Sequence, residues 1–229
     1  MDPRATLRAT ESARFRDVKT EISDTRLRSA SVNIARLDDT GRSDGVGSDP
    51  VVGVVLAAGA GRRYGMPKIL AAQGDWLNTA VSALADGGCD DVAVTMGAAV
   101  VEAPDGAATI NVGNWADGLS ASVRAALGWA HARENVAGVV LHVVDMPDVG
   151  AEVVARVCRQ AGRRRDAVVR ARYRGVPGHP VYLGADHLAG VLDSLNGDVG
   201  AAAYLRAHAD IVETIDCADL ASGRDIDEP

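Results

Sequence analysis

A glycine-rich stretch with basic side chains is the part of this sequence best suited to chemistry. Residues 59–68 contain glycines at positions 59, 61 and 65, together with Arg63 and Lys68. Glycine leaves backbone N–H groups free to approach an anion, and the two cationic side chains add fixed positive charge. The stretch therefore predicts a phosphate-binding loop. The alternative is a tight turn whose basic residues only face solvent.

The spacing of this stretch excludes two common phosphate-binding loops. Its third glycine, Gly65, comes one residue too late for the G-x-G-x-x-G pattern of dinucleotide-binding proteins. Lys68 is neither preceded by glycine nor followed by serine or threonine, as the P-loop requires. The loop must therefore belong to another kind of nucleotide or phosphate site.

An aspartate elsewhere in the chain could hold a metal ion. Asp145 directly follows the apolar run 138–144, and carboxylate oxygens are the ligands that Mg²⁺ prefers. The alternative is that Asp145 caps the following helix. Asp225 and Asp227 form an acidic cluster near the C-terminus, which residue type alone describes equally well as a solvated tail. Asp148 is expected to be a helix cap.

Alternating strands and helices must position these groups. The β-branched run 51–57, just before the glycine-rich stretch, predicts a strand buried on both faces, as in a parallel sheet. Patterns of the same kind predict further strands at 91–96, 108–112, 138–144, 167–173, 181–183 and 211–215, and helices at 76–85, from 119 onward, 151–160, 186–194 and 199–208. Gly87-Gly88 and Gly162 are expected to end helices. Asp117 is expected to cap the next helix, with Leu119 on the apolar face of that helix. Residues 175–180 are expected to form a turn.

This order predicts an α/β fold with a doubly wound, mostly parallel, Rossmann-like sheet and helices on both faces. Ligands bind such sheets at the carboxyl ends of the strands. The glycine-rich stretch and Asp145 both follow strands, so both are expected at that edge.

Composition separates the first 49 residues from the rest. Residues 1–49 are rich in Arg, Asp, Ser and Thr with few apolar residues, which predicts a disordered tail or a mis-extended start of the reading frame, followed by one domain at 50–229. The net charge of −7 argues against nucleic acid as a partner. The three cysteines are far apart, which suggests a reducing compartment, and no apolar stretch predicts a membrane span or a secretory signal. A cytoplasmic location is expected.

Residues 56–68 resemble the L-A-A-G-x-[SG]-x-R-[MFY]-G-x-P-K signature of the MobA-like nucleotidyltransferases, in the branch that includes the molybdenum cofactor cytidylyltransferases. The resemblance implies a loop that wraps a nucleoside triphosphate. Nucleotide contacts are then implied for three groups of residues: Leu56, Ala57 and Ala58 beside the base and ribose, Gly59 and Gly61 through their backbone, and Arg63 and Lys68 at the phosphates.

Other motifs extend the resemblance along the chain. Asp145-Met146-Pro147 matches the family's D-M-P, whose aspartate binds metal, and residues 225–229 partly match its terminal D-I-D motif, with Asp227 favoured over Asp225 as a second metal ligand. His179 and Asp198 lie in G-H-P and G-D-x-G motifs that line the acceptor side in the family. Ser122, in a segment like the family's W-x-x-G-x-x-x-S, could bond a ribose or the helix backbone. His142 is expected to be a core residue.

The resemblance implies a Mg²⁺-dependent nucleotidyltransferase that uses Arg63, Lys68 and Asp145 in catalysis. CTP is the favoured nucleotide, the acceptor is a small phosphorylated molecule of the molybdopterin type, and a molybdoenzyme is an implied client. Two alternatives remain. Proteins named for nicotine blue oxidoreductase share this pattern, which implies reduction of a quinone-like pigment with nicotinamide and flavin. A non-catalytic factor that carries a nucleotide or pterin is the other.

Overall fold

The computed structural model describes residues 49–228. The predicted tail, residues 1–49, lies outside the described residues except for Asp49, and the domain boundary at residue 50 stays a prediction. Among the described residues, no helix is both long enough and apolar enough to cross a membrane.

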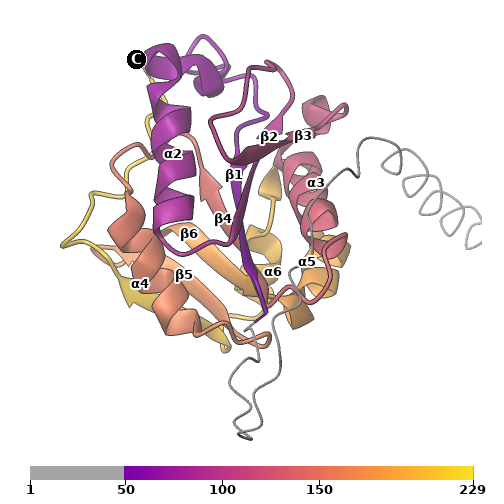
Figure 1. Ribbon diagram of the computed structural model, residues 1–229, viewed down its shortest axis with the longest axis vertical. Helices are drawn as coiled ribbons and strands as arrows, with labels where there is room; N and C mark the ends of the chain where they lie inside the picture. Colours follow the sequence, from indigo (N-terminus) through magenta and orange to yellow (C-terminus); the bar gives the residue numbers. More distant parts are fainter. Residues whose placement is uncertain (1–48, 229) are drawn as a thin grey trace, which may run out of the picture. The chain divides into compact units, whose positions relative to one another are not determined.

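A seven-stranded sheet forms the centre of the described chain (Figure 1). From edge to edge its strands are β3 (Ala107–Asn111), β2 (Asp91–Met96), β1 (Val51–Leu56), β4 (Gly138–Val143), β6 (Val176–Gly184), β5 (Val168–Tyr173) and β7 (Val212–Asp216). Only β6 runs against its neighbours; the other strands of this sheet share one direction. The predicted mostly parallel α/β fold is confirmed.

Helices cover both faces of the sheet. In Figure 1, α2 (Asp75–Asp86) and α4 (Ala151–Ala161) lie on one side, and α3 (Leu119–His131), α5 (Leu188–Ser194) and α6 (Ala202–Ala207) lie on the other. Short 3₁₀ helices join these elements: η1 (Lys68–Gly74), η2 (Trp115–Asp117), η3 (Ala185–His187) and η4 (Gly197–Val199).

The apolar run of β1 is continuous because both of its faces are buried. Val51 and Val55 join the hydrophobic cluster that contains the inward residues of α2 and α4. Val52, Val54 and Leu56 join the opposite cluster, which contains those of α3, α5 and α6. Side chains alternate along a strand, so the two helical layers need apolar residues at every position of β1.

The predicted turn at residues 175–180 is wrong. The turn consists of Arg174 and Gly175, whose φ angles are 52° and 86°, and β6 begins at Val176 and pairs with β5. Two positive-φ residues make the tight hairpin that matches strand twist. Glycine and proline at 175–180 predicted a turn, but they lie in the part of β6 that has no β4 partner. The β4–β6 pairing covers only residues 181–184 of β6, so proline is tolerated before it.

Two predicted helix caps are also wrong. The residue before α3 is Gly118, with a φ of 105° and no side-chain cap, while Asp117 accepts a hydrogen bond from Asn114 Nδ2. The residue before α4 is Gly150, and Asp148 instead accepts a hydrogen bond from the backbone N–H of Ser222 at 2.7 Å. Leu119, placed on the inward stripe of α3, is 41% exposed. By contrast, Gly87 and Gly162 end α2 and α4 as predicted.

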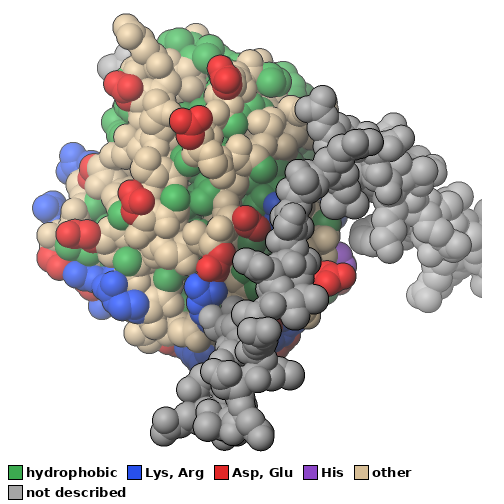
Figure 2. Space-filling view, viewed as in Figure 1, with side chains coloured by type: hydrophobic (Ala, Val, Ile, Leu, Met, Phe, Trp, Pro, Cys, Tyr) green, Lys and Arg blue, Asp and Glu red, His purple; other side chains and the backbone are tan. Residues whose placement is uncertain are grey.

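Basic and acidic side chains are interleaved on the surface drawn in Figure 2, where Lys and Arg gather toward the left and lower edges with acidic groups among them. Ion pairs also occur on the surface of the described chain. Arg163 pairs with Asp90, and Arg164 pairs with Glu213. A cation that is paired in this way adds little to a long-range positive field.

Candidate active site

The candidate site lies where the order of the sheet reverses. The chain runs from β1 outward through β2 to β3, then returns to the other side of β1 as β4. The loop 57–67 leaves the carboxyl end of β1, and Asp145 follows β4 beside it. Such a switch point is the usual ligand position in open α/β sheets.

Lys68 is the centre of a charged cluster at this position. Its Nζ lies 2.8 Å from Asp145 Oδ2 and 2.9 Å from Asp227 Oδ1. Arg63 Nη1 lies 2.7 Å from Asp227 Oδ2. The Lys68 side chain is only 12% exposed, whereas that of Arg63 is 76% exposed. The fold therefore brings together these four residues, all selected from the sequence, which we call the Lys68 cluster.

The charges of the Lys68 cluster support one another. Burial alone would lower the pKa of the Lys68 ammonium, but hydrogen bonds to Asp145 and Asp227 and their negative charges outweigh it and leave that pKa raised. The hydrogen bond from Lys68 lowers the pKa of the Asp227 carboxyl, despite some opposing burial. Lys68 is therefore cationic and Asp227 anionic at neutral pH.

Glycine shapes the loop at Gly61 for a steric reason. Gly61 has a φ of 58°, and a Cβ there would lie 1.9 Å from the Met66 carbonyl oxygen. The Gly61 carbonyl accepts a hydrogen bond from Gly65 N–H at 2.9 Å, which closes the turn. At Gly59, by contrast, a Cβ would meet no described atom within 4 Å. Gly61 is needed for the turn itself, and Gly59 leaves open space above the backbone.

Contacts on either side hold the loop. Ala57 N–H donates to Thr95 Oγ1 at 3.1 Å, and the Ala58 carbonyl accepts from Ala98 N–H at 3.0 Å. The Tyr64 ring lies 5.4 Å from the Trp76 ring of α2, measured between centroids. The side chains of Leu56, Ala57 and Ala58 are buried in hydrophobic clusters, so these residues can reach a nucleotide only through their backbone.

The segment after β7 delivers Asp227 to the Lys68 cluster. Residues 217–228, which we call the C-terminal strap, return across the carboxyl ends of the strands. Ser222 N–H donates to Asp148 Oδ2, and Ile226 N–H donates to the Asp145 carbonyl at 2.9 Å. Asp225 makes no contact with Lys68 among the described residues; its charge instead acts on His179.

The donor set of this cluster fits a hard divalent cation. Asp145 and Asp227 each place one carboxylate oxygen on the same ammonium group, so both converge on one point. No cluster of three or more His, Cys, Asp or Glu residues suited to a metal occurs in the described part of the chain. A cation here would take two carboxylates and complete its shell with water and phosphate oxygens, as Mg²⁺ commonly does.

The other sequence candidates lie apart from this cluster. Ser122 is buried in α3. Asp198 lies in η4, close enough to the start of α3 that a Cβ on Gly118 would be 2.4 Å from its Oδ1. His179 in β6 is half-buried, and burial together with the Arg170 cation lowers its pKa to about 4, although Asp225 opposes this. Between residues 49 and 228, none of the three pairs with Lys68, Asp145 or Asp227.

Sequence reasoning missed the groups that hold the strap. Asp148 was expected to cap α4, and the Ile226 backbone was not considered. Arg156 of α4 and Asp219 of the strap form a two-pronged ion pair that no motif marked. Their sequence separation is long, so no local pattern could have revealed them.

Residues 53–212 match the model of the MobA-like NTP transferase domain. The chain is 30% identical over 195 residues to nicotine blue oxidoreductase from Paenarthrobacter nicotinovorans, which covers 77% of this chain and 92% of that protein.

Solved structures resemble the fold over most of its length. Rv0371c from Mycobacterium tuberculosis H37Rv superposes with a TM-score of 0.64 and 24% identity, covering 79% of this chain and 94% of that one. A complex of Rv0371c with manganese gives a TM-score of 0.59 and 25% identity, with 73% and 88% covered. A nucleotidyl transferase from Methanothermobacter thermautotroptrophicus gives 0.65 and 20% identity, with 79% and 93% covered, and its likeness concerns the fold alone.

Proposed function

The chain belongs to the MobA-like NTP transferase family, and from this premise we propose that it transfers a nucleoside monophosphate from a nucleoside triphosphate to a phosphorylated acceptor, releasing pyrophosphate. The observation that supports this most is the Lys68 cluster, where two cations and two carboxylates converge beside a glycine loop. Positively charged groups of this kind are what a triphosphate needs, and paired carboxylates are what its metal needs.

The reaction needs no covalent nucleophile from the protein. An oxygen of the acceptor phosphate attacks the α-phosphorus of the triphosphate, a new P–O bond forms, and the bond to the departing pyrophosphate breaks. Lys68 and Arg63 bind phosphate oxygens and offset the charge that develops on the leaving group. The backbone of Gly59 and Gly61 faces the same phosphates.

We assign a divalent cation, Mg²⁺ in our proposal, to Asp145 and Asp227. When bound, such an ion neutralises phosphate charge and holds the triphosphate in a reactive arrangement. The manganese complex of Rv0371c supports a divalent metal in a relative of this fold.

The nucleotide and the acceptor are narrower proposals. The Ala57-Ala58 pair before Gly59 supports CTP by resemblance to the cytidylyltransferase branch. A small acceptor of the pterin type, with a molybdoenzyme as client, follows from the same resemblance. His179, Asp198 and Ser122 are our candidates for the acceptor side and the ribose.

An oxidoreductase is the second candidate because the 30% identical relative is named nicotine blue oxidoreductase. That reading requires a nicotinamide and a flavin. The glycine loop does not have the spacing of a nicotinamide-binding loop, and nothing in the Lys68 cluster suits hydride transfer.

A thermal-shift series separates these candidates. The protein is heated with Mg²⁺ and each nucleoside triphosphate in turn, with NADPH and FMN as comparators. A ligand that binds only the folded state raises the midpoint of unfolding in proportion to the logarithm of its concentration. We expect a shift with CTP and Mg²⁺. A shift with FMN or NADPH and none with any triphosphate would overturn the proposal. Triphosphate binding without pyrophosphate release from any acceptor would instead indicate a non-catalytic carrier.

A further inference from the structure

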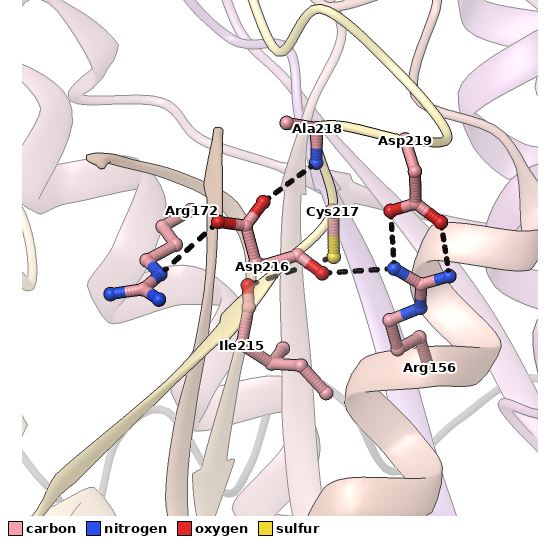
Figure 3. A network of polar contacts seen from close by, with 7 residues as sticks. All are labelled: Arg156, Arg172, Ile215, Asp216, Cys217, Ala218 and Asp219. Atoms are coloured by element: carbon pink, nitrogen blue, oxygen red, sulfur yellow. Dashed lines mark hydrogen bonds and ion pairs between the residues drawn. The ribbon is translucent and has the colours of Figure 1, made fainter. Parts of the chain in front are cut away.

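An ion pair on α4 fixes the beginning of the C-terminal strap. Arg156 Nη1 and Nη2 donate to the two carboxylate oxygens of Asp219 at 2.6 and 2.8 Å, and Nη1 also donates to the Asp216 carbonyl at 2.9 Å (Figure 3). Asp216 in turn accepts from Ala218 N–H at 3.0 Å and lies 3.6 Å from Arg172 Nε. Arg156 therefore binds the chain both before and after Cys217, at Asp216 and at Asp219.

Burial completes this anchor. Cys217 is fully buried, and its carbonyl accepts hydrogen bonds from Leu220 and Ala221 N–H at 3.0 and 3.1 Å. Leu220 and Ala221 pack against the hydrophobic cluster on the α2 and α4 side. The chain at 217–221 is thus folded into a fixed turn against α4.

The rest of the strap is held by few polar contacts. Ser222 N–H reaches Asp148, Arg224 N–H reaches Ser222 Oγ at 3.3 Å, and Ile226 N–H reaches the Asp145 carbonyl. Asp227 then contacts Lys68 and Arg63. Gly223 also lies directly against the Tyr173 ring, where a Cβ would be 2.0 Å from a ring carbon. These contacts are spaced along residues 222–228, and the turn at 217–221 sets the point from which this half of the strap starts.

The Arg156–Asp219 pair has a geometry that lets a surface ion pair contribute to holding the chain in place. Most exposed pairs are weak, but a two-pronged arginine–carboxylate pair is directional, and here a backbone carbonyl adds a third bond. The Arg156 side chain is 27% exposed. The hydrogen bond from Arg156 lowers the pKa of Asp219, so the pair is charged throughout the neutral range.

We propose that Arg156 is a positioning residue for nucleotidyl transfer: it anchors the C-terminal strap so that Asp227 reaches Lys68 and the metal position. The inference rests on the proposed function. This role predicts that loss of Arg156 weakens metal binding but strengthens triphosphate binding in the absence of metal. With metal, Asp227 helps to hold the cation. Without metal, the same carboxylate competes with a triphosphate for Lys68 and Arg63.

The first test compares Arg156→Ala with Arg159→Ala. Arg159 lies one turn along α4 and makes no hydrogen bond or ion pair within residues 49–228. Asp219→Asn is a second variant at an exposed position, because it removes the negative charge and one of the two oxygens that accept hydrogen bonds from Arg156. Hydrogen exchange of the backbone amides at 222–228 should accelerate in Arg156→Ala and Asp219→Asn but not in Arg159→Ala.

Two ligand measurements should change in opposite directions in Arg156→Ala. In Arg156→Ala, the Mg²⁺ concentration that gives half-maximal pyrophosphate release should rise about tenfold, the scale of losing an outer-sphere support of a metal ligand. Binding of CTP without metal should tighten about threefold, because the competing carboxylate is released. General damage to the fold would weaken both, so weakening of both overturns the proposal.

Asp227→Asn decides whether Arg156 acts through Asp227. If it does, adding Arg156→Ala to Asp227→Asn should change neither the Mg²⁺ dependence nor metal-free CTP binding further. A full additional effect in the double variant, or identical behaviour of the Arg156 and Arg159 variants, would overturn the inference. Absence of pyrophosphate release from the unaltered protein would overturn the proposed function instead. The hydrogen-exchange comparison would then still test whether Arg156 anchors the C-terminal strap.

Discussion

At the scale of single residues, Lys68 joins the two carboxylates of the candidate site. Its ammonium lies between Asp145, which follows β4, and Asp227, which lies near the end of the chain. Only 12% of the side chain is exposed, so solvent screens these contacts less than those of Arg63. Removing the ammonium would leave Asp145 without its cationic partner and Asp227 with only the exposed Arg63.

Replacing either member of the Lys68–Asp145 pair should therefore abolish most of the activity. We expect Lys68→Ala and Asp145→Ala each to lower pyrophosphate release by at least ~10²-fold, the scale of losing one preorganised charge. Arg62→Ala is the matched control, because Arg62 is an exposed neighbour with no ion pair in the described chain. Near-normal release by either variant, with its fold intact by circular dichroism, would refute these roles.

At the scale of elements, the loop after β1 gives its two central glycines different tasks. Gly61 has a positive φ and the Met66 carbonyl directly above it, whereas Gly59 faces open space. A methyl group at Gly61 meets the protein's own backbone. At Gly59 it would meet only a ligand that lies over the loop.

We expect Gly61→Ala to lower the free energy of unfolding by about 1 to 3 kcal/mol, because it adds backbone strain and a clash. Gly59→Ala should leave the free energy of unfolding within about 0.5 kcal/mol and weaken triphosphate binding. Urea unfolding and a CTP titration of both variants measure the two effects. Unchanged CTP binding in Gly59→Ala would show that the phosphates do not lie over this residue.

At the scale of the whole molecule, the sheet contains one buried group that is poorly satisfied. His142 in β4 is fully buried, and neither ring nitrogen has a hydrogen-bond partner in the part of the chain that is described. Burial, with a smaller contribution from His179, lowers the pKa of His142 to about 3. As expected from the sequence, it is a core residue, and it is held there in its neutral form.

This buried histidine should make the protein sensitive to mild acid. The unfolded chain takes up a proton on His142 near its ordinary pKa of about 6.5, whereas the folded protein does so only near 3. The free energy of unfolding should therefore fall by about 2 kcal/mol from this group as the pH drops from 7 to 5. Urea unfolding at several pH values measures the slope.

His142→Leu is the comparison for the pH series. Its slope between pH 7 and 5 should be smaller, with a remainder from His179, whose pKa is lowered to about 4. The hydrogen bonds from Arg163, Arg164, Arg156 and Lys68 lower the pKa values of Asp90, Glu213, Asp219 and Asp227, so these four carboxylates contribute little in this range. An unchanged slope in His142→Leu would exclude His142 as the cause.

Much of the fold could be predicted from local patterns. All strands of the sheet were expected near their observed positions, because β-branched runs such as 51–56 suit a strand between two helical layers. The helix ends at Gly87-Gly88 and Gly162 were predicted from glycine, and Gly88 and Gly162 take the positive φ angles, 105° and 60°, that glycine adopts readily. The start of β6 and the caps of α3 and α4 were predicted wrongly, because Pro-Gly and Asp signals describe local preference and tertiary pairing overrode it.

For the candidate site, the sequence by itself determined the family, the loop after β1 and the position of Asp145 at the same strand edge. These follow from short-range motifs and from the rule that parallel strands end together. The resemblance favoured Asp227 over Asp225, but only the tertiary structure shows that Asp227 meets Lys68 and Arg63. The path of the C-terminal strap depends on Arg156–Asp219 and Asp148–Ser222, contacts between residues more than sixty positions apart. Such contacts form only when the whole sheet has assembled, so no periodicity in the chain encodes them.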